Sequence, residues 1–211
     1  MNLGSQSRTI QEDFWAGSFG SEYIGRNNSP DLLASNLSFF VHALEKAGAV
    51  CSCIEFGANI GMNLRALRLL YPNMRQRAIE INHDAANELG NWLGHSNVFL
   101  GSIADWEPTE QHDLALIKGV LIHIHPDLLQ RTYEKLHAAS SRLILVCEYY
   151  NPTPVMIPYR GHSDRLFKRD FCGEILDRFS DLKLVDYGFA YHRDPAFPQD
   201  DITWFLLEKR S

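Results

Sequence analysis

The chain has 211 residues and a formal net charge of -6, with 45% hydrophobic and 22% charged residues. This length fits one α/β domain with a full core. The acidic balance argues against bulk binding to nucleic acid or to an anionic membrane surface. No apolar run reaches the roughly 20 residues of a membrane span, and residues 1–11 lack the apolar core of a secretory signal. We therefore expect a cytoplasmic protein.

The side chains that commonly bind metals are spread along the chain. Its four cysteines form no C-x-x-C pair. His123 and His125 alternate, so they would face opposite sides of an extended segment. We therefore expect buried free thiols and no bound metal ion.

An aromatic- and glycine-rich segment without a clean period precedes the first strand, at residues 11–28. We expect residues 1–30 to form an N-terminal arm, which is a candidate lid over a pocket. Arg26 would then bind a ligand carboxylate through its planar fork of N–H groups. The alternative is a packed arm with Arg26 on the surface.

Helical and strand-like patterns then alternate as far as residue 146. We expect helices at 31–47, 62–71, 84–93 (capped by Asp84) and from 126 on, and strands at 50–54, 76–81, 98–100, 114–117 and 143–146. This alternation predicts a doubly wound, mostly parallel sheet. Ligands of such sheets bind beyond the carboxyl ends of the strands.

The pattern changes after residue 148. Residues 148–161 are too rich in proline for a helix, and a helix is expected at about 168–179. Two further strands, at 182–191 and 202–209, predict an antiparallel C-terminal hairpin and complete a seven-stranded sheet. We expect one domain over residues 1–211, with residues 148–167 as an insertion on the substrate side.

A strand, a glycine loop and a helix follow one another at residues 50–71. Gly57 and Gly61 have no Cβ, so the chain can turn sharply there or lie against a ligand. Glu55 stands at the strand end, where a carboxylate repels phosphate but accepts hydrogen bonds from an amine. The loop, with Asn59 in it, predicts a nucleotide-like ligand that carries an ammonium group. The alternative is an ordinary connection with glycines for turn geometry.

Two further strand ends contribute to the same predicted pocket. Glu80 ends the second strand, where a carboxylate can accept both hydroxyl protons of a ribose, and Ile81 follows it. Ser102 and Ile103 would lie beside an adenine, one as a hydrogen-bonding group and the other as an apolar face. An acid at the same place occurs in NAD-binding folds, so Glu80 does not show which ribose-containing cofactor the protein binds. Its alternative role is that of a solvated acid at a helix cap.

Residues 148–170 are the most unusual part of the sequence. Tyr149, Tyr150 and Asn151 would wall the substrate site, and five potentially cationic residues follow in an acidic chain. Arginine forks at the pocket would favour a phosphate or carboxylate substrate. The alternative is a salt-bridge network at a helix start. The substrate-binding residues expected here are Tyr149, Asn151, Tyr159, Arg160, His162, Arg165 and Lys168.

Residues 54–61 (IEFGANIG), 78–80 (AIE) and 119–124 (GVLIHI), with the order of elements over 31–209, resemble class I S-adenosylmethionine-dependent methyltransferases. Longer strings look like a narrower group, the methyltransferases associated with pseudaminic acid biosynthesis. They lie at 14–27, 148–154, 157–162 and 164–171. The narrower resemblance implies a sugar-pathway substrate only weakly, because the name of that group reflects an association.

The resemblance implies S-adenosyl-L-methionine as cofactor and a small, anionic metabolite as the methyl acceptor. The site residues Arg26, Glu55, Gly57, Asn59, Gly61, Glu80, Ile81, Ser102, Ile103 and Lys118 would bind the cofactor. His123 is the candidate base, Lys118 would orient or polarise the acceptor, and Tyr150 would join them in catalysis. His125, before Pro126, is expected to cap a helix.

The chain departs from the wider superfamily pattern in three places. Asn59 stands where many members have glycine, strand three ends in Gly101-Ser102 without an acid, and no Asn/Asp-Pro-Pro-Tyr/Phe motif follows strand four. Three other readings stay open: a protein or peptide methyltransferase, a nucleotide-dependent dehydrogenase, and a non-catalytic module with the same fold. The missing dinucleotide glycine fingerprint argues against the dehydrogenase.

Overall fold

The computed structural model describes residues 8–25, 28–159 and 162–210, with the backbone alone for 162–165. One seven-stranded sheet has the order β3-β2-β1-β4-β5-β9-β8. Its parallel part comprises β1 (Ser52–Phe56), β2 (Arg75–Glu80), β3 (Val98–Leu100), β4 (His112–Lys118) and β5 (Ser140–Glu148). The antiparallel pair β8 (Leu182–Ala190) and β9 (Ile202–Lys209) completes it. This confirms the predicted doubly wound sheet with its C-terminal hairpin.

Helices cover both faces of the sheet, because strand residues alternate between two hydrophobic cores. Leu114 and Leu116 of β4 pack with α3, α4 and α5, whereas Ala115 and Ile117 pack with α6 and α7. The helices are α3 (Pro30–Ala43), α4 (Met62–Leu70), α5 (His83–Leu93), α6 (Pro126–Ala139) and α7 (Phe171–Arg178), with the short 3-10 turns η1 (His95–Asn97) and η2 (Leu121–His123).

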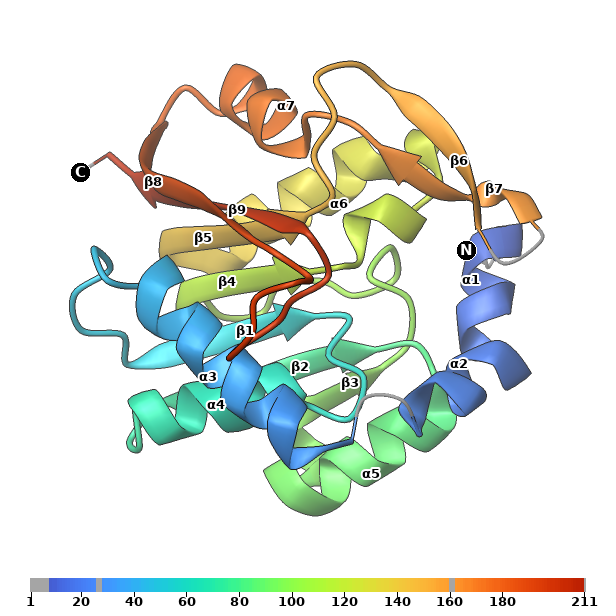
Figure 1. Cartoon of the computed structure of the whole chain (residues 1–211), viewed down its shortest axis with the longest axis horizontal. Coiled ribbons are helices and arrows are strands. Elements are labelled where there is room, and N and C mark those ends of the chain that lie inside the picture. The colour runs from blue at the N-terminus through green and yellow to red at the C-terminus, as the bar shows by residue number, and fades with distance from the viewer. Residues whose placement is uncertain (1–7, 26–27, 160–161, 211) are drawn as a thin grey trace.

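Three segments gather at one edge of this layered structure. The N-terminal helices α1 (Ile10–Ala16) and α2 (Ser18–Ile24) lie beside the hairpin of β6 (Val155–Tyr159) and β7 (His162–Lys168), as Figure 1 shows. The strand order reverses between β1 and β4, so these segments lie near the point where doubly wound sheets bind ligands.

Several predicted boundaries were wrong, for identifiable reasons. The expected helix 168–179 begins only at Phe171, because residues 162–168 pair with 155–159 as a second small sheet. The cap of α5 is Asn82, whose Oδ1 accepts from the N–H groups of Asp84 and Ala85, so Asp84 lies inside the helix. The expected arm contains two short helices. The first begins with a capping box between Thr9 and Glu12.

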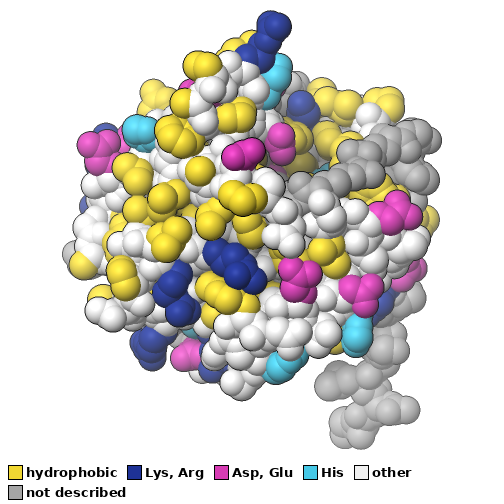
Figure 2. All heavy atoms as spheres, turned by 60° about the horizontal axis from the view of Figure 1, so that its bottom comes forward, with side chains coloured by type: hydrophobic (Ala, Val, Ile, Leu, Met, Phe, Trp, Pro, Cys, Tyr) yellow, Lys and Arg dark blue, Asp and Glu magenta, His cyan; other side chains and the backbone are white. Residues whose placement is uncertain are grey.

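Acidic, basic and hydrophobic side chains are interspersed on the face drawn in Figure 2. Of the helices that the structure describes, none combines the length and the apolar character needed to cross a bilayer. Among the described residues, no three His, Cys, Asp or Glu side chains are arranged to hold a metal ion. Cys53, Cys147 and Cys172 are buried thiols, but Cys51 is exposed.

Candidate functional site

A cavity of about 290 Å³ lies at the carboxyl ends of the central strands. Its wall comes from the loops after β1, β2, β3 and β4, from the N-terminal helices, and from the loop between β8 and β9. The sequence predicted the contribution of the strand ends, since parallel strands end at a common edge.

The loop after β1 turns through left-handed backbone at Gly57 (φ 74), Asn59 (φ 49) and Gly61 (φ 81). A Cβ on Gly57 would lie 2.6 Å from Cγ2 of Val120, so only glycine fits between the two lips of the cavity. A Cβ on Gly61 would meet Leu89 at 2.5 Å. Gly57 and Asn59 therefore line the cavity, whereas Gly61 serves the packing of α4 on α5.

Glu80 is the buried acid of the cavity wall, with 7% of its surface exposed. Its Oε2 accepts from the Asn59 N–H at 2.6 Å and its Oε1 from the Asn82 N–H at 2.7 Å. Burial raises the pKa of Glu80, and these backbone donors oppose that shift. Each oxygen keeps a lone pair, so the fixed carboxylate can still accept hydrogen bonds from a ligand.

Ile81, Ser102 and Ile103 also line the cavity, beside Glu80. The Ser102 hydroxyl donates to the Glu12 carboxylate of α1 and accepts from the Ala104 N–H at 3.0 Å. Sequence reasoning missed Glu12, because contact between the N-terminal arm and the end of β3 leaves no local pattern.

Glu55 lies beneath the cavity and not in its wall, so the expected contact between its carboxylate and a ligand amine is not built in. The side chain is fully buried and accepts from Asn63 Nδ2 at 2.6 Å. Burial raises the pKa of Glu55 to about 8, although Asn63 and Lys118 oppose the shift. Asn63 reaches the cavity in its place.

Lys118 ends β4 and lines the cavity, as predicted from its position. Its Nζ lies 5.5 Å from the ring centre of Phe39. Burial lowers the pKa of Lys118, while Cys147, Asp200 and two glutamates oppose the shift. The nearby Glu148 holds the lip that follows, because its Oε1 accepts from the N–H groups of Val120 and Leu121 at 2.9 and 2.8 Å.

Aromatic rings from three distant segments meet over the cavity. The His123 ring of η2 lies 4.7 Å from the Trp15 ring of α1 and 5.3 Å from the Tyr159 ring of β6. Phe19 of α2 lies 6.3 Å from Tyr159. His123 and Tyr159, both candidate site residues from the sequence, thus line the cavity together, and Trp15, which was not predicted, joins them.

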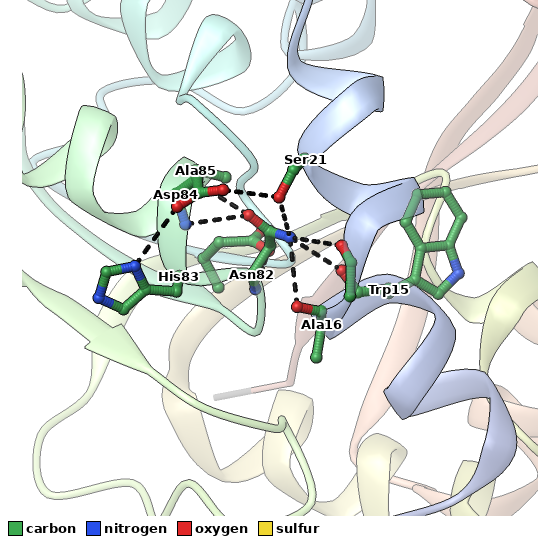
Figure 3. A network of polar contacts seen from close by, with 9 residues as sticks. Trp15, Ala16, Ser21, Asn82, His83, Asp84 and Ala85 are labelled. Carbon is green, nitrogen blue, oxygen red and sulfur yellow. Dashed lines mark hydrogen bonds and ion pairs between the residues drawn. The ribbon is translucent and has the colours of Figure 1, made fainter.

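Polar contacts hold the N-terminal helices on the start of α5 (Figure 3). Asn82 Nδ2 donates to the carbonyl oxygens of Trp15 and Gly17, both at 3.2 Å. The Ser21 hydroxyl donates to Asp84 Oδ2 at 2.7 Å. Asn82 therefore caps α5 and fastens the helical pair at the same time.

Several predicted site residues lie elsewhere. Tyr150 is exposed and packs near Phe205, with ring centres 6.3 Å apart, so it is away from the cavity wall. Asn151 Nδ2 donates to the Thr153 carbonyl at 2.5 Å, and Lys168 lies over the Tyr149 ring at 4.9 Å. Tyr149 itself lines the cavity. Outside the described residues or side chains are Arg26, Arg160, His162 and Arg165.

The polar residues of the wall that were not predicted include Asn36 of α3, and Gln199 and Asp200 of the β8–β9 loop. Gln199 Nε2 donates to Asn36 Oδ1 at 3.1 Å, and both side chains are buried. No sequence signal pointed to them, since 163 positions separate the partners.

Solved structures with the same architecture are numerous. The chain has the fold of S-adenosylmethionine-dependent methyltransferases. A 1,6-didemethyltoxoflavin-N1-methyltransferase from Burkholderia thailandensis matches with a TM-score of 0.69 at 16% identity, over 99% of this chain and 94% of that one. Magnesium protoporphyrin IX methyltransferase from Synechocystis PCC 6803 matches with a TM-score of 0.67 at 13% identity, over 97% and 100%.

A plantazolicin methyltransferase, solved in complex with a pentazolic desmethylPZN analogue, matches with a TM-score of 0.64 at 12% identity, over 95% of each chain. The sequence matches no protein-family model and no curated protein. The wider resemblance therefore holds at the level of the fold, and the narrower one to the pseudaminic acid group has no support.

Proposed function

We propose that this protein transfers a methyl group from S-adenosyl-L-methionine to a small molecule. The observation that carries the proposal is Glu80, a carboxylate fixed by two backbone N–H groups at the end of β2 with lone pairs left for a ligand diol. It stands in a fold whose solved examples include several with this cofactor or its demethylated product.

The residues present fit this cofactor. Glu80 would accept from the ribose hydroxyls, and Ile81, Ser102 and Ile103 would enclose the adenine. The acids Glu12, Glu80 and Asp200 outnumber Lys118 in the wall, which suits a ligand with sulfonium and ammonium charges. When bound, the cofactor supplies an electrophilic methyl group whose S–C bond breaks as the acceptor attacks.

The protein's own part is alignment and proton removal. The aromatic rings of Trp15, His123 and Tyr159 at the cavity would exclude water and orient the acceptor. His123 is the candidate group to take the acceptor proton. Lys118 would stabilise negative charge on the acceptor, which supports the anionic metabolite that the sequence predicted from the basic residues of 159–170. A sugar-pathway acceptor stays a prediction.

A protein acceptor is the weaker candidate, because residues of α1 and α2, Trp15 among them, form part of the cavity wall. A peptide acceptor is the second candidate, since the plantazolicin methyltransferase has the same fold. The presence of α1 and α2 in the cavity wall therefore favours an acceptor small enough to fit inside the cavity.

The test compares four ligands by thermal shift: S-adenosylmethionine, S-adenosylhomocysteine, NAD and NADP, each at about 1 mM, which is roughly 100 times a Kd of about 10 μM. We expect the first two to raise Tm by several degrees and the other two to leave it unchanged. Stabilisation by NAD alone would overturn the proposal.

A further inference from the structure

The cavity pairs an aromatic group with a buried pair of amides, and this combination indicates a substrate class. We infer, on the basis of the proposed function, that the methyl acceptor is a planar heteroaromatic ring with a lactam-type edge. The ring would lie among the aromatic residues Trp15, His123, Tyr149 and Tyr159. Asn36 and Gln199 would read the neighbouring N–H and C=O groups of its edge.

The amide pair is the specific part. Asn36 is 2% exposed and Gln199 is 7% exposed, and both line the cavity. They share one hydrogen bond, from Gln199 Nε2 to Asn36 Oδ1 at 3.1 Å. Within the described part of the chain, the Asn36 N–H₂ group and the Gln199 Oε1 make no further hydrogen bond. Two amides joined by one bond leave one N–H₂ group and one carbonyl oxygen wholly unpaired, whichever of them donates.

A free donor beside a free acceptor is the complement of a lactam, an imide or a similar ring edge. Such an edge offers an N–H and a C=O side by side, so both orphan groups are satisfied at once. A ligand without that edge leaves buried polar groups unpaired, and sites of this kind reject such ligands strongly. The amide pair therefore acts as a specificity element.

The aromatic part explains why the acceptor is planar. Trp15, His123 and Tyr159 come from α1, η2 and β6. The ring centre of His123 lies 4.7 Å from that of Trp15 and 5.3 Å from that of Tyr159. Flat rings that converge on one space favour stacked or edge-on contact with another flat ring. Their faces offer little to a flexible aliphatic chain beyond its apolar area.

Tyr149 connects the two parts of the cavity. It lines the wall at the end of β5. Burial raises the pKa of its hydroxyl, and the charge of Asp200, the neighbour of Gln199, adds to this shift together with Tyr23 and Tyr159. The Tyr149 hydroxyl thus stays neutral. Because the aromatic residues and the amide pair line the same cavity as Tyr149, one ligand can contact both.

Three probes separate the two elements: quinolin-2-one carries ring and lactam edge, quinoline the ring alone, and 2-piperidone the edge alone. Calorimetry measures their binding in saturating S-adenosylhomocysteine. We expect quinolin-2-one to bind at least tenfold more tightly than either of the others. In the double variant Asn36→Leu/Gln199→Leu, which leaves no orphan amide, its affinity should fall to that of quinoline. Tyr159→Leu should weaken quinoline and quinolin-2-one alike.

Gln130→Leu, at an exposed amide of α6, is the matched control and should bind as the wild type does. Retained binding of S-adenosylhomocysteine shows that each variant is folded. Equal affinity of the wild type for quinoline and quinolin-2-one would overturn the inference, and so would binding of none of the three probes. In both cases cofactor binding leaves the proposed function intact. Failure of the wild type to bind S-adenosylhomocysteine would instead overturn the proposed function.

Discussion

The two halves of the cavity are built in different ways. The half around Glu80 is made of strand ends and the turns after them, held by backbone hydrogen bonds from Asn59 and Asn82. The half around Trp15 and Gln199 is made of side chains from α1, α3, η2, β6 and the β8–β9 loop, which meet through tertiary contacts. The first half is fixed by the sheet and the second by the segments packed around it.

This difference separates what the fold supplies from what this chain adds. A fixed carboxylate and a left-handed turn at a strand end are features that the doubly wound sheet offers to any ligand with a ribose. The aromatic group and the amide pair depend on particular side chains at the rim, where substrate specificity resides in such folds. Variants in the first half should thus affect the cofactor, and variants in the second the acceptor.

The largest expected effect comes from Glu80→Ala. The change removes the acceptor for the ribose and also frees the Asn59 and Asn82 N–H groups. We expect the Kd for S-adenosylhomocysteine to rise roughly 100-fold, since a hydrogen bond to a charged group contributes about 1.5–3 kcal/mol. Isothermal calorimetry measures it. Glu45→Ala, at an exposed position before β1, is the control and should change nothing. Unchanged cofactor affinity in a folded Glu80→Ala protein would remove Glu80 from the proposed role.

The second prediction concerns Gly20 of α2. A Cβ there would lie 2.0 Å from the Trp15 carbonyl oxygen and 2.7 Å from Asn82 Nδ2, so Gly20→Ala displaces the contact that fastens the helical pair. We expect limited proteolysis to cut within residues 8–25 at least tenfold faster, while the sheet remains resistant. Gly25→Ala is matched: its Cβ would meet only the Glu22 carbonyl, at 3.9 Å. Equal cleavage of the two variants would show that Gly20 does not hold the pair in place.

The cofactor half was largely predictable from the sequence, and the acceptor half was not. A strand end and the turn after it are local, so Gly57, Glu80 and Ser102 could be placed from the alternation of elements alone. The predicted position of the Glu55 side chain was wrong, because successive side chains of a strand point to opposite faces of the sheet. The Glu55 side chain points beneath the cavity, toward Asn63. Backbone position alone did not reveal this.

The acceptor half depends on contacts between residues far apart in the chain. The pairing of β6 with β7 turned the expected proline-rich loop into a hairpin, and that hairpin places Tyr159 against His123. Tyr150 is exposed, so its predicted catalytic role has no support from its position. Asn36 and Gln199 meet only once α3 and the β8–β9 loop are packed together.

The third prediction uses the buried acid beneath the cofactor half. The pKa of Glu55 is raised from 4.5 to about 8. Between these values the folded protein keeps a proton that the unfolded chain has released, so the free energy of unfolding falls as pH rises. Glu55→Gln removes this titration and keeps an acceptor for Asn63. We expect Glu55→Gln to raise the free energy of unfolding at pH 8 by about 1–2 kcal/mol, so that its Tm exceeds the wild-type value by about 2–6 °C. At pH 5 the difference in Tm should be smaller.

The measurement is a melting curve at each half pH unit from 5 to 8.5. Glu148, whose burial raises its pKa to about 7, titrates in both proteins, so the difference between the two curves isolates Glu55. Glu45→Gln at the surface serves as the control. Parallel curves for Glu55→Gln and the wild type would mean that Glu55 is already ionised in the folded protein.

The smallest effect is expected from Lys168→Met, at the boundary between the hairpin and the acceptor half. The Lys168 ammonium lies 4.9 Å from the Tyr149 ring centre, a contact worth about 0.5–1 kcal/mol. Methionine keeps the length of the side chain but not its charge, so we expect Tm to fall by about 1–3 °C. Cofactor affinity should stay within twofold, because the contact lies on the acceptor side. Arg75→Met, at an exposed residue of β2, removes a charge without a ring beneath it and should not shift Tm. A loss of cofactor affinity in Lys168→Met would mean that the two halves are coupled through Tyr149, and that the hairpin helps to form the cofactor site as well.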